Sequence, residues 1–328
     1  MKHIYTTLNN LGSVKLNEPL SKHTTFKIGG DADLFFIVEE TNKLIEALQY
    51  LDNEGVPYMV LGGGSNMLVA DQGFRGVVIQ IKDKAIEIDG TSVMAAAGAI
   101  TVQVAHASVK AGLTGFEWGV GVPGTIGGAV RGNAGAMGVE MVDNVEKVEV
   151  YKDGEVYTLT NEKCEFSYRS SIFKQEGGVV LRVWLSLKKA PEGTNGMKKA
   201  LEVLMYRNTT QPKGFASTGC IFTNPDARED NDIGIKNRQA LLQHFDSEDE
   251  KIQRFLDIGK ISAGWLIEQA GLKGATIGGA SVSEVHGNFI VNSNNATAKD
   301  VLDLVEKIKS TVYTTYSILL EEEFQAIT

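Results

Sequence analysis

Cysteine is scarce in this sequence, with only Cys164 and Cys220 among 328 residues, so no disulfide framework is available. No apolar run reaches membrane-spanning length, and the first twelve residues lack the apolar core of a signal peptide. These absences argue against a disulfide-stapled secreted scaffold and against a membrane protein. A reducing cytoplasm is therefore the expected location.

Positive charge is also low, because the sequence has 32 Lys and Arg residues and 41 Asp and Glu residues, which gives a formal net charge of −9. Sequence-independent nucleic-acid binding needs a basic surface, so no nucleic-acid partner is expected. The five histidines show neither an H-E-x-x-H pattern nor another paired spacing. The sequence therefore predicts no metal site.

Glycine, in contrast, is abundant at 36 residues. Eight of the twenty residues in 119–138 are glycine, and their partners are Val, Pro, Ile, Ala and Met rather than the Ser, Glu or Lys of a flexible linker. A backbone without Cβ atoms can approach a ligand closely, and clustered amide donors suit an anion such as a phosphate. This stretch is interpreted as a tight ligand loop.

A second glycine loop, residues 62–66, follows a short apolar run. Two loops of this kind could hold two parts of one extended phosphate ligand, or they could be two structural turns. There is no G-x-G-x-x-G opening a helix and no P-loop lysine, so a nicotinamide-binding Rossmann domain is disfavoured.

Hydrophobic periodicity places the secondary structure. Helices are predicted at 41–53, 101–111, 197–207, 262–270 and 297–312, and strands at 58–61, 77–81, 93–97 and 179–187. Apolar residues alternate with a period of two on both sides of Asp153-Gly154, which predicts a β-hairpin with its turn at these two residues. The composition changes at 189–195, where we expect a domain boundary. The charged residues of 226–260 are interpreted as the solvated face of one or two amphipathic helices.

Few side chains stand out as candidates for chemistry. Arg169 lies among aromatic and hydroxyl residues, and its planar fork suits a carboxylate or phosphate, although a surface arginine is the simpler interpretation. Cys220 lies in a shaped Gly-Cys-Ile-Phe-Thr-Asn-Pro loop, where proton donor and nucleophile both remain open, whereas Cys164 is interpreted as a buried small hydrophobe. His286 is interpreted as a structural residue, and Glu321 to Glu323 as a solvated acidic end.

Several stretches, taken in order along nearly the whole chain, resemble the flavin-dependent UDP-N-acetylenolpyruvoylglucosamine reductases of peptidoglycan synthesis, the MurB family. They are TTFKIGG from Thr24, VLGGGSNMLVADQGFRGVVI from Val60, GVPGTIGGAVRGNAGAMG from Gly121, YRSSIFK from Tyr168, GCIFTNP from Gly219, SAGWLIEQAGLKG from Ser262 and SEVHGNFIVN from Ser283. Several motifs in register are far more specific than any one of them.

The resemblance implies an α+β fold. Its FAD-binding domain, of the type shared with vanillyl-alcohol oxidase, would occupy residues 1–195 in two α+β parts, about 1–90 and 91–195. A smaller α+β substrate-binding domain would occupy 196–328, with an insertion at about 226–260 and a C-terminal tail that returns to the active site.

The resemblance also implies bound FAD, NADPH as co-substrate and a UDP-sugar as substrate, which would be reduced to UDP-N-acetylmuramate in the cytoplasm. The residues expected to hold the FAD diphosphate are Gly62, Gly63, Gly64, Ser65, Asn66, Pro123, Gly124, Thr125, Gly127 and Gly128, with Asn133 and Gly135 nearby. Asn224 matches a substrate-binding position.

Three residues match the family's catalytic groups. Arg169 and Glu323 would meet the carboxylate on which charge develops during reduction. Cys220 stands where the family usually has a proton-donating serine, and a thiol is a competent acid. Thr223 replaces the family's usual lysine, which removes an expected cationic contact to the UDP diphosphate. There are two rival hypotheses for the function of the protein. It could be another flavin oxidoreductase of the same fold, or a binding homologue that has lost catalytic activity.

Overall fold

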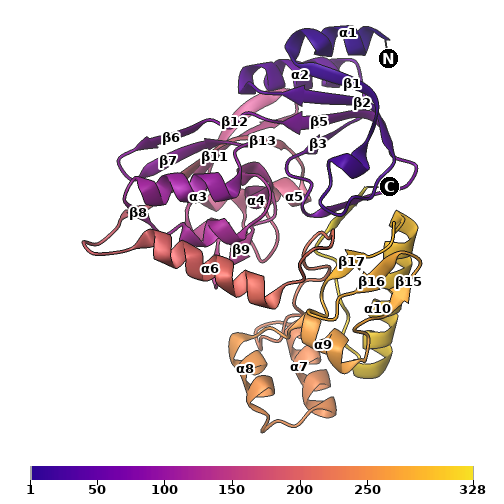
Figure 1. Cartoon of the computed structure of the whole chain (residues 1–328). Helices are drawn as coiled ribbons and strands as arrows, with labels where there is room; N and C mark the ends of the chain where they lie inside the picture. The colour runs from indigo at the N-terminus through magenta and orange to yellow at the C-terminus, as the bar shows by residue number, and fades with distance from the viewer. Residues whose placement is uncertain (1, 328) are drawn as a thin grey trace. The chain divides into compact units, whose positions relative to one another are not determined.

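The computed structural model describes residues 2–327, which divide into two compact units (Figure 1). Unit 1 takes in the described residues up to Pro19 together with Asp31–Ser65 and Phe74–Thr209. Unit 2 takes in Leu20–Gly30, Asn66–Gly73 and the described residues from Thr210 on. No helix among the described residues is both long and apolar enough to span a membrane.

The first sheet of unit 1 has the strand order β1-β2-β5-β3 and is formed by Ser13–Pro19, Asp31–Val38, Phe74–Ile81 and Tyr58–Leu61. β5 pairs in parallel with both β2 and β3, while β1 is antiparallel to β2. Helices α1 (Lys2–Leu11) and α2 (Thr41–Asn53) pack against it. Because β3 ends at Leu61, the first glycine loop begins at the end of a parallel strand.

The second sheet of unit 1 is antiparallel, in the order β12-β11-β13-β7-β6. Its strands are Glu155–Thr160, Val145–Lys152, Val179–Ser186, Ser92–Ala96 and Ile86–Asp89. Helices α3 (Thr101–Lys110) and α4 (Ile126–Arg131) pack on it, and α4 contacts β13 and β7. The sheet thereby supports the second glycine loop, which leads directly into α4.

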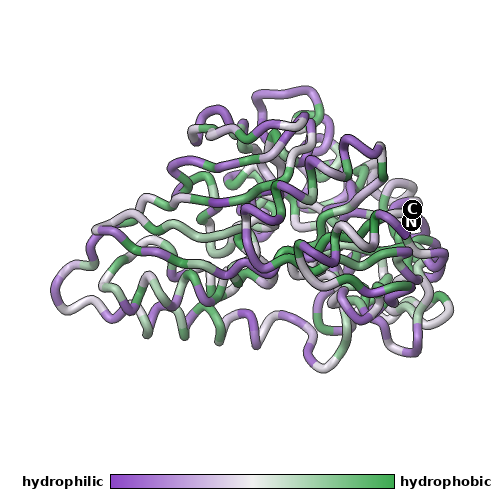
Figure 2. Tube along the Cα trace, turned by 90° about the horizontal axis from the view of Figure 1, so that it is seen from above, coloured by the Kyte–Doolittle hydropathy of each residue, from purple (hydrophilic) through white to green (hydrophobic). Residues whose placement is uncertain are grey.

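Short elements complete unit 1. They are β8 (Leu113–Thr114), η2 (Glu117–Gly121), β9 (Gly135–Ala136), β10 (Val139–Glu140), η3 (Met141–Asp143), η4 (Glu162–Cys164), α5 (Ile172–Gln175) and β14 (Lys188–Lys189). The longer helix α6 (Gly196–Thr210) follows them. Figure 2 shows hydrophobic and hydrophilic residues alternating along the trace, with hydrophilic residues frequent at the outer loops.

Unit 2 is built around helix α10 (Ala298–Tyr316), which packs on the small antiparallel sheet β15-β16-β17 and on helices α7 and α9. The other elements are η1 (Leu20–Lys22), β4 (Met67–Val69), α7 (Asp232–His244), α8 (Glu250–Ile258), α9 (Ala263–Gln269), β15 (Thr276–Ile277), β16 (Ala280–Val282), β17 (Ile290–Asn292) and β18 (Gln325–Ile327). The predicted capping box is present, because Thr297 and Asp300 exchange side-chain and backbone hydrogen bonds.

The division into units differs from the predicted boundary between residues 195 and 196. Helix α6 belongs to unit 1 because Ala200 and Val203 are buried in its core. Phe26, Ile28 and Leu68 instead lie in the core of unit 2, far in sequence from its other members. In addition, β6 pairs with β7, so the second sheet starts before residue 91. Long-range packing of this kind leaves no compositional signal.

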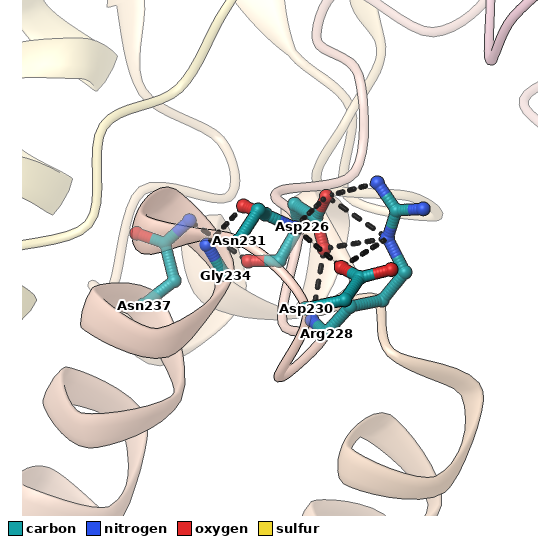
Figure 3. A network of polar contacts seen from close by, with 6 residues as sticks. All are labelled: Asp226, Arg228, Asp230, Asn231, Gly234 and Asn237. Carbon is teal, nitrogen blue, oxygen red and sulfur yellow. Dashed lines mark hydrogen bonds and ion pairs between the residues drawn. The ribbon is translucent and has the colours of Figure 1, made fainter.

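Segment 226–260 folds into helices α7 and α8. Its two ends meet in an antiparallel backbone β-bridge between Asp226 and Lys260. Figure 3 shows the polar network at this base, where the Asp226 carboxylate accepts hydrogen bonds from Arg228 and Asn231. Asn231 in turn accepts from the Gly234 amide, and Asn237 donates to the Asp226 carbonyl. The segment is therefore an ordered helical hairpin fastened at its base.

Candidate active site

The two glycine loops of unit 1 pack directly against each other. A Cβ on Gly63 would lie 2.6 Å from the Gly124 Cα, and one on Gly62 would lie 2.5 Å from Thr125 Oγ1. The Ser65 hydroxyl donates to the Pro123 carbonyl at 3.2 Å. Glycine is required at 62 and 63 because no side chain fits between the loops. The loops thus form one continuous cradle.

Only some amides of this cradle lack a protein acceptor among the described residues. The Ile126 and Gly127 amides donate to the Ala99 and Ala97 carbonyls, so neither is free for an anion. Within residues 2–327 the amides of Gly63, Gly124 and Thr125 have no protein acceptor. Gly127 serves instead as a packing residue, since a Cβ there would lie 2.8 Å from the Ala97 Cβ. Gly128 is exposed, and the Thr125 hydroxyl accepts a long hydrogen bond from its amide.

Asn133, Gly135 and Arg169 are brought together in unit 1 by Glu140. The buried Asn133 donates to the Glu140 carboxylate at 2.8 Å and to the Ser167 carbonyl at 2.9 Å, and it accepts from the Val142 amide. Arg169 donates to the Glu140 carboxylate at 3.4 Å and to the Gly135 carbonyl at 3.5 Å. The Asn133 side chain is thus committed to fixing the turn that holds Glu140.

Arg169 lies on a backbone that few side chains adopt, with φ at +57°. An L-residue in this left-handed region is strained, and such strain concentrates at functional sites. Its guanidinium lies 5.1 Å from the Tyr168 ring centroid, and its carbonyl accepts from Lys174 Nζ at 3.1 Å. The neighbouring contacts therefore hold both the backbone and the side chain of Arg169 in place.

In unit 2, the segment that carries Cys220 is held by Asn288. The buried Asn288 side chain donates to the Phe222 carbonyl at 2.8 Å and accepts from the Phe222 amide at 2.9 Å. The backbone of Cys220 forms an isolated antiparallel β-bridge with that of Phe289. Gly219 before it has φ at +85°, a conformation that favours glycine. The thiol is half-buried on a rigid turn.

The C-terminal tail runs antiparallel to this segment, so Glu323 lies opposite Ile221, the residue after Cys220. The Glu323 amide donates to the Ile221 carbonyl at 2.8 Å, and the Thr223 amide donates to the Glu321 carbonyl at 2.9 Å. The tail continues into β18, which pairs in parallel with β4. The segment 321–323, interpreted from sequence as a solvated end, is therefore fastened to the Cys220 turn.

Asn66, at the end of the first glycine loop, belongs to unit 2 and is tied to the same tail. Its side-chain amide donates to the Glu323 carbonyl at 3.3 Å, and its own carbonyl accepts from the Gln325 amide at 3.0 Å. Asn66 thus helps to position Glu323.

Asn224 and Thr218 flank Cys220 at short distance along the chain. The Asn224 carboxamide oxygen accepts from the Ala263 amide at 3.1 Å, at the start of α9, so its nitrogen is the group that a ligand would meet. Thr218 Oγ1 is buried and has no hydrogen-bond partner among the described residues. A buried hydroxyl without a partner costs about 1–3 kcal/mol, so a ligand or water that binds here would recover part of that cost.

Glu140 and Asn288 were missed at the sequence level. Asn288 lies in the SEVHGNFIVN motif, but nothing local indicates that it holds a segment 66 residues earlier. Glu140 lies two residues after the glycine stretch, yet its partner Arg169 lies 29 residues away. Neither role has a signal in spacing or composition.

The conservative interpretations of Cys164 and His286 are confirmed. Cys164 is fully buried, and burial raises its pKa to about 11, so it is a poor acid and nucleophile at neutral pH. His286 Nδ1 accepts from the Asn288 amide at 3.1 Å within its turn, and burial lowers its pKa. His286 therefore stabilises the turn in its neutral form.

Comparisons with known proteins cover both units. Residues 32–160 match the FAD binding domain family, and residues 211–327 match the C-terminal domain family of UDP-N-acetylenolpyruvoylglucosamine reductase. The chain is 38% identical to the UDP-N-acetylenolpyruvoylglucosamine reductase of Caldanaerobacter subterraneus subsp. tengcongensis, over 96% of this chain and 94% of that one. It is 38% identical to the reductase of Bacillus subtilis, over 97% and 95%.

A solved structure with the same architecture is the UDP-N-acetylenolpyruvylglucosamine reductase of Thermus caldophilus. It is 34% identical, has a TM-score of 0.73, and the match covers 97% of this chain and 99% of that one. The α+β architecture with an FAD-binding domain and a second domain, expected from sequence, is thereby confirmed.

Proposed function

Because the chain belongs to the UDP-N-acetylenolpyruvoylglucosamine reductase family, we propose that it reduces the enolpyruvyl ether of a UDP-sugar to UDP-N-acetylmuramate during peptidoglycan precursor synthesis. It is a flavin-dependent oxidoreductase with FAD as cofactor and NADPH as co-substrate. The observation that carries the proposal is the match to these reductases over nearly the full length of the chain. In this chain the Glu323 backbone is also hydrogen-bonded to the turn that carries Cys220. We place the enzyme in the cytoplasm, where a free thiol stays reduced.

The glycine cradle of unit 1 fits the diphosphate of FAD. The amides of Gly63, Gly124 and Thr125 supply hydrogen-bond donors, and the exposed Gly128 leaves bare backbone beside them. Among the other expected residues, Gly62 and Gly127 support the cradle by close packing, and Ser65 ties its two halves together. We therefore assign unit 1 to cofactor binding and unit 2 to substrate binding.

FAD, when bound, supplies the hydride that it has received from NADPH. The addition of hydride to the carbon–carbon double bond places negative charge on the substrate carboxylate and its neighbouring carbon. Arg169 offsets that charge, and the Glu140 contact keeps its guanidinium in one orientation. By resemblance to the family, Glu323 is proposed as a second hydrogen-bonding group for the substrate carboxylate.

Cys220 then donates the Sγ proton to the carbon next to the carboxylate, which completes the addition of a hydride and a proton across the double bond. The serine usual at this position has a far less acidic hydroxyl, so the thiol is a sufficient acid for the same step. The thiolate that remains recovers its proton from solvent. We infer that the turn fixed by Asn288 aims this group.

Asn224 is proposed to bind the UDP diphosphate through its side-chain nitrogen. The lysine usual at the position of Thr223 is missing, so charge neutralisation at this diphosphate must come from another cation. Lys213 and Lys273 are the candidates.

The replacements at Cys220 and Thr223 also favour a second candidate, a flavin oxidoreductase of the same fold that acts on a different substrate. One assay separates the two functions. The purified protein is expected to bind FAD and to oxidise NADPH only when UDP-N-acetylglucosamine enolpyruvate is added. Substrate-independent oxidation, or none at all from the FAD-loaded protein, would contradict the reductase assignment.

A further inference from the structure

Arg131 is a half-buried cation that has no counterion among residues 2–327. It is the last residue of α4, and its guanidinium has no hydrogen bond or ion pair with any residue in the described part of the chain. Its backbone is fixed, because the Ser171 hydroxyl donates to the Arg131 carbonyl at 2.7 Å. Burial lowers the pKa of Arg131, with no carboxylate acting in the opposite direction.

Half-buried arginines elsewhere in unit 1 do have partners. Arg169 meets Glu140 at 3.4 Å, and Arg182 meets Glu149 at 2.7 Å. The chain carries 41 acidic side chains against 32 basic ones, so carboxylates are not scarce. Removing a cation from water without a partner costs free energy. This cost is recovered if an anion binds next to Arg131.

The position of Arg131 on α4 indicates where that anion lies. Arg131 follows Gly128 by three residues, so the two share a face of the helix, and helical side chains lean toward the preceding turn. Gly128 is exposed, and the nearest atom to a Cβ built on it is Thr125 Oγ1, at an ordinary 3.6 Å. The absence of a side chain at position 128 therefore leaves open space over the turn of α4 toward which the Arg131 side chain is expected to lean.

We propose that the Arg131 guanidinium binds a phosphate oxygen of the FAD diphosphate held by the two glycine loops. The proposal rests on the proposed function, since FAD is the phosphate ligand assigned to the cradle. Arginine is suited to this contact because its planar fork can donate two hydrogen bonds to one phosphate. The cradle amides are neutral donors, so Arg131 adds the positive charge that they lack.

The test measures FAD binding to the FAD-free full-length protein by flavin fluorescence, for the parent, Arg131→Met and Arg182→Met. Arg131→Met is expected to raise the Kd for FAD about ten- to a hundredfold, as for loss of a charged hydrogen bond. Its Kd should also depend less on salt concentration than that of the parent. Arg182→Met removes a matched half-buried arginine and should leave the Kd within about twofold.

The thermal stability of the FAD-free proteins gives an independent readout. Arg131→Met should melt at the same or a higher temperature than the parent, because it removes an uncompensated charge. If Arg131 had a merely structural role, Arg131→Met would instead lower the melting temperature. It would then weaken FAD binding only to the extent that the fold is destabilised. An unchanged Kd for FAD in Arg131→Met overturns the proposal.

Two further outcomes are distinguishable. If Arg131→Met leaves the Kd for FAD unchanged and alters the preference for NADPH over NADH, the anion is the 2′-phosphate of the co-substrate and the diphosphate assignment is wrong. If the parent protein itself binds no FAD, the proposed function fails, whatever Arg131 does.

Discussion

Cys220 is the residue at which this chain departs most clearly from the catalytic pattern that it resembles. Replacement by alanine removes the proton donor but leaves the turn held by Asn288 intact. We expect Cys220→Ala to be reduced by NADPH at the parent rate and to be reoxidised by the enolpyruvyl substrate about 10²- to 10⁴-fold more slowly, the usual contribution of general acid catalysis. Stopped-flow flavin absorbance separates the two half-reactions.

Cys220→Ser is the matched control, because it restores a hydroxyl of nearly the same size. It should keep most of the reoxidation rate. Equal reoxidation rates in the parent and Cys220→Ala would exclude the thiol as donor.

Glu140 is proposed as a positioning residue that acts through Arg169. Glu140→Gln should slow reoxidation by the enolpyruvyl substrate about tenfold or more, because a neutral amide orients the guanidinium less strongly. The NADPH half-reaction should keep its rate, since the co-substrate has no carboxylate for Arg169 to meet. Glu149→Gln, which breaks the comparable pair with Arg182 at 2.7 Å, should change neither half-reaction. A loss of both half-reactions in Glu140→Gln would indicate a general structural defect instead.

Asp226 makes stability depend on pH in the acid range. Hydrogen bonds from Arg228 lower the pKa of this carboxyl group to about 2, below its ordinary unfolded value of about 3.9. Its contribution is therefore complete above about pH 4 and is lost as the pH falls toward 2. Urea unfolding at a series of pH values should show this loss in the parent and a flatter profile in Asp226→Asn. Identical profiles for the two proteins would show that solvent fully screens the interaction between Asp226 and Arg228.

At the scale of elements, the glycine cradle can be tested by two substitutions with opposite expectations. A Cβ at position 63 strikes the backbone of Gly124, whereas a Cβ at position 128 meets only Thr125 Oγ1 at 3.6 Å. Gly63→Ala should therefore lower both thermal stability and FAD affinity. Gly128→Ala should keep or raise the stability of the FAD-free protein, since alanine favours a helix by about 0.5–1 kcal/mol over glycine, and should still weaken FAD binding.

Calorimetric melting and flavin fluorescence measure the two quantities independently. If Gly128→Ala binds FAD as tightly as the parent, no ligand lies against that face of α4, and the cradle is a structural junction between two loops.

At the scale of the whole molecule, unit 2 depends on chain segments from the N-terminal half. Phe26, Ile28 and Leu68 are buried in its core, and β18 pairs with β4. A fragment of residues 211–328 keeps β18 but lacks these three core residues and β4, although residues 211–327 match a domain family. We expect this fragment to show no cooperative thermal transition by circular dichroism, and co-expression with residues 1–210 to restore it. A fragment that melts cooperatively on its own would contradict this expectation.

Local patterns identified several longer elements, but not α4 or the short strands that carry the site residues. Helix α2 and strand β3 have the predicted bounds, and the hairpin turns at Asp153-Gly154, because periodicity, caps and turn residues act over a few positions. The two glycine loops were also visible in the sequence, since close approach of backbones requires glycine itself.

The sequence by itself determined the α+β class, the family and the residue types available for chemistry, because these depend on local composition and ordered motifs. The tertiary structure decided which groups meet: Glu140 with Arg169, Asn288 with the Cys220 turn, and the tail with Asn66. It also gave Arg131 no counterion within the described part of the chain and moved α6 and the two N-terminal segments across the expected boundary. Such pairings join residues tens to hundreds of positions apart, where burial and hydrogen-bond satisfaction act and local propensity carries no information.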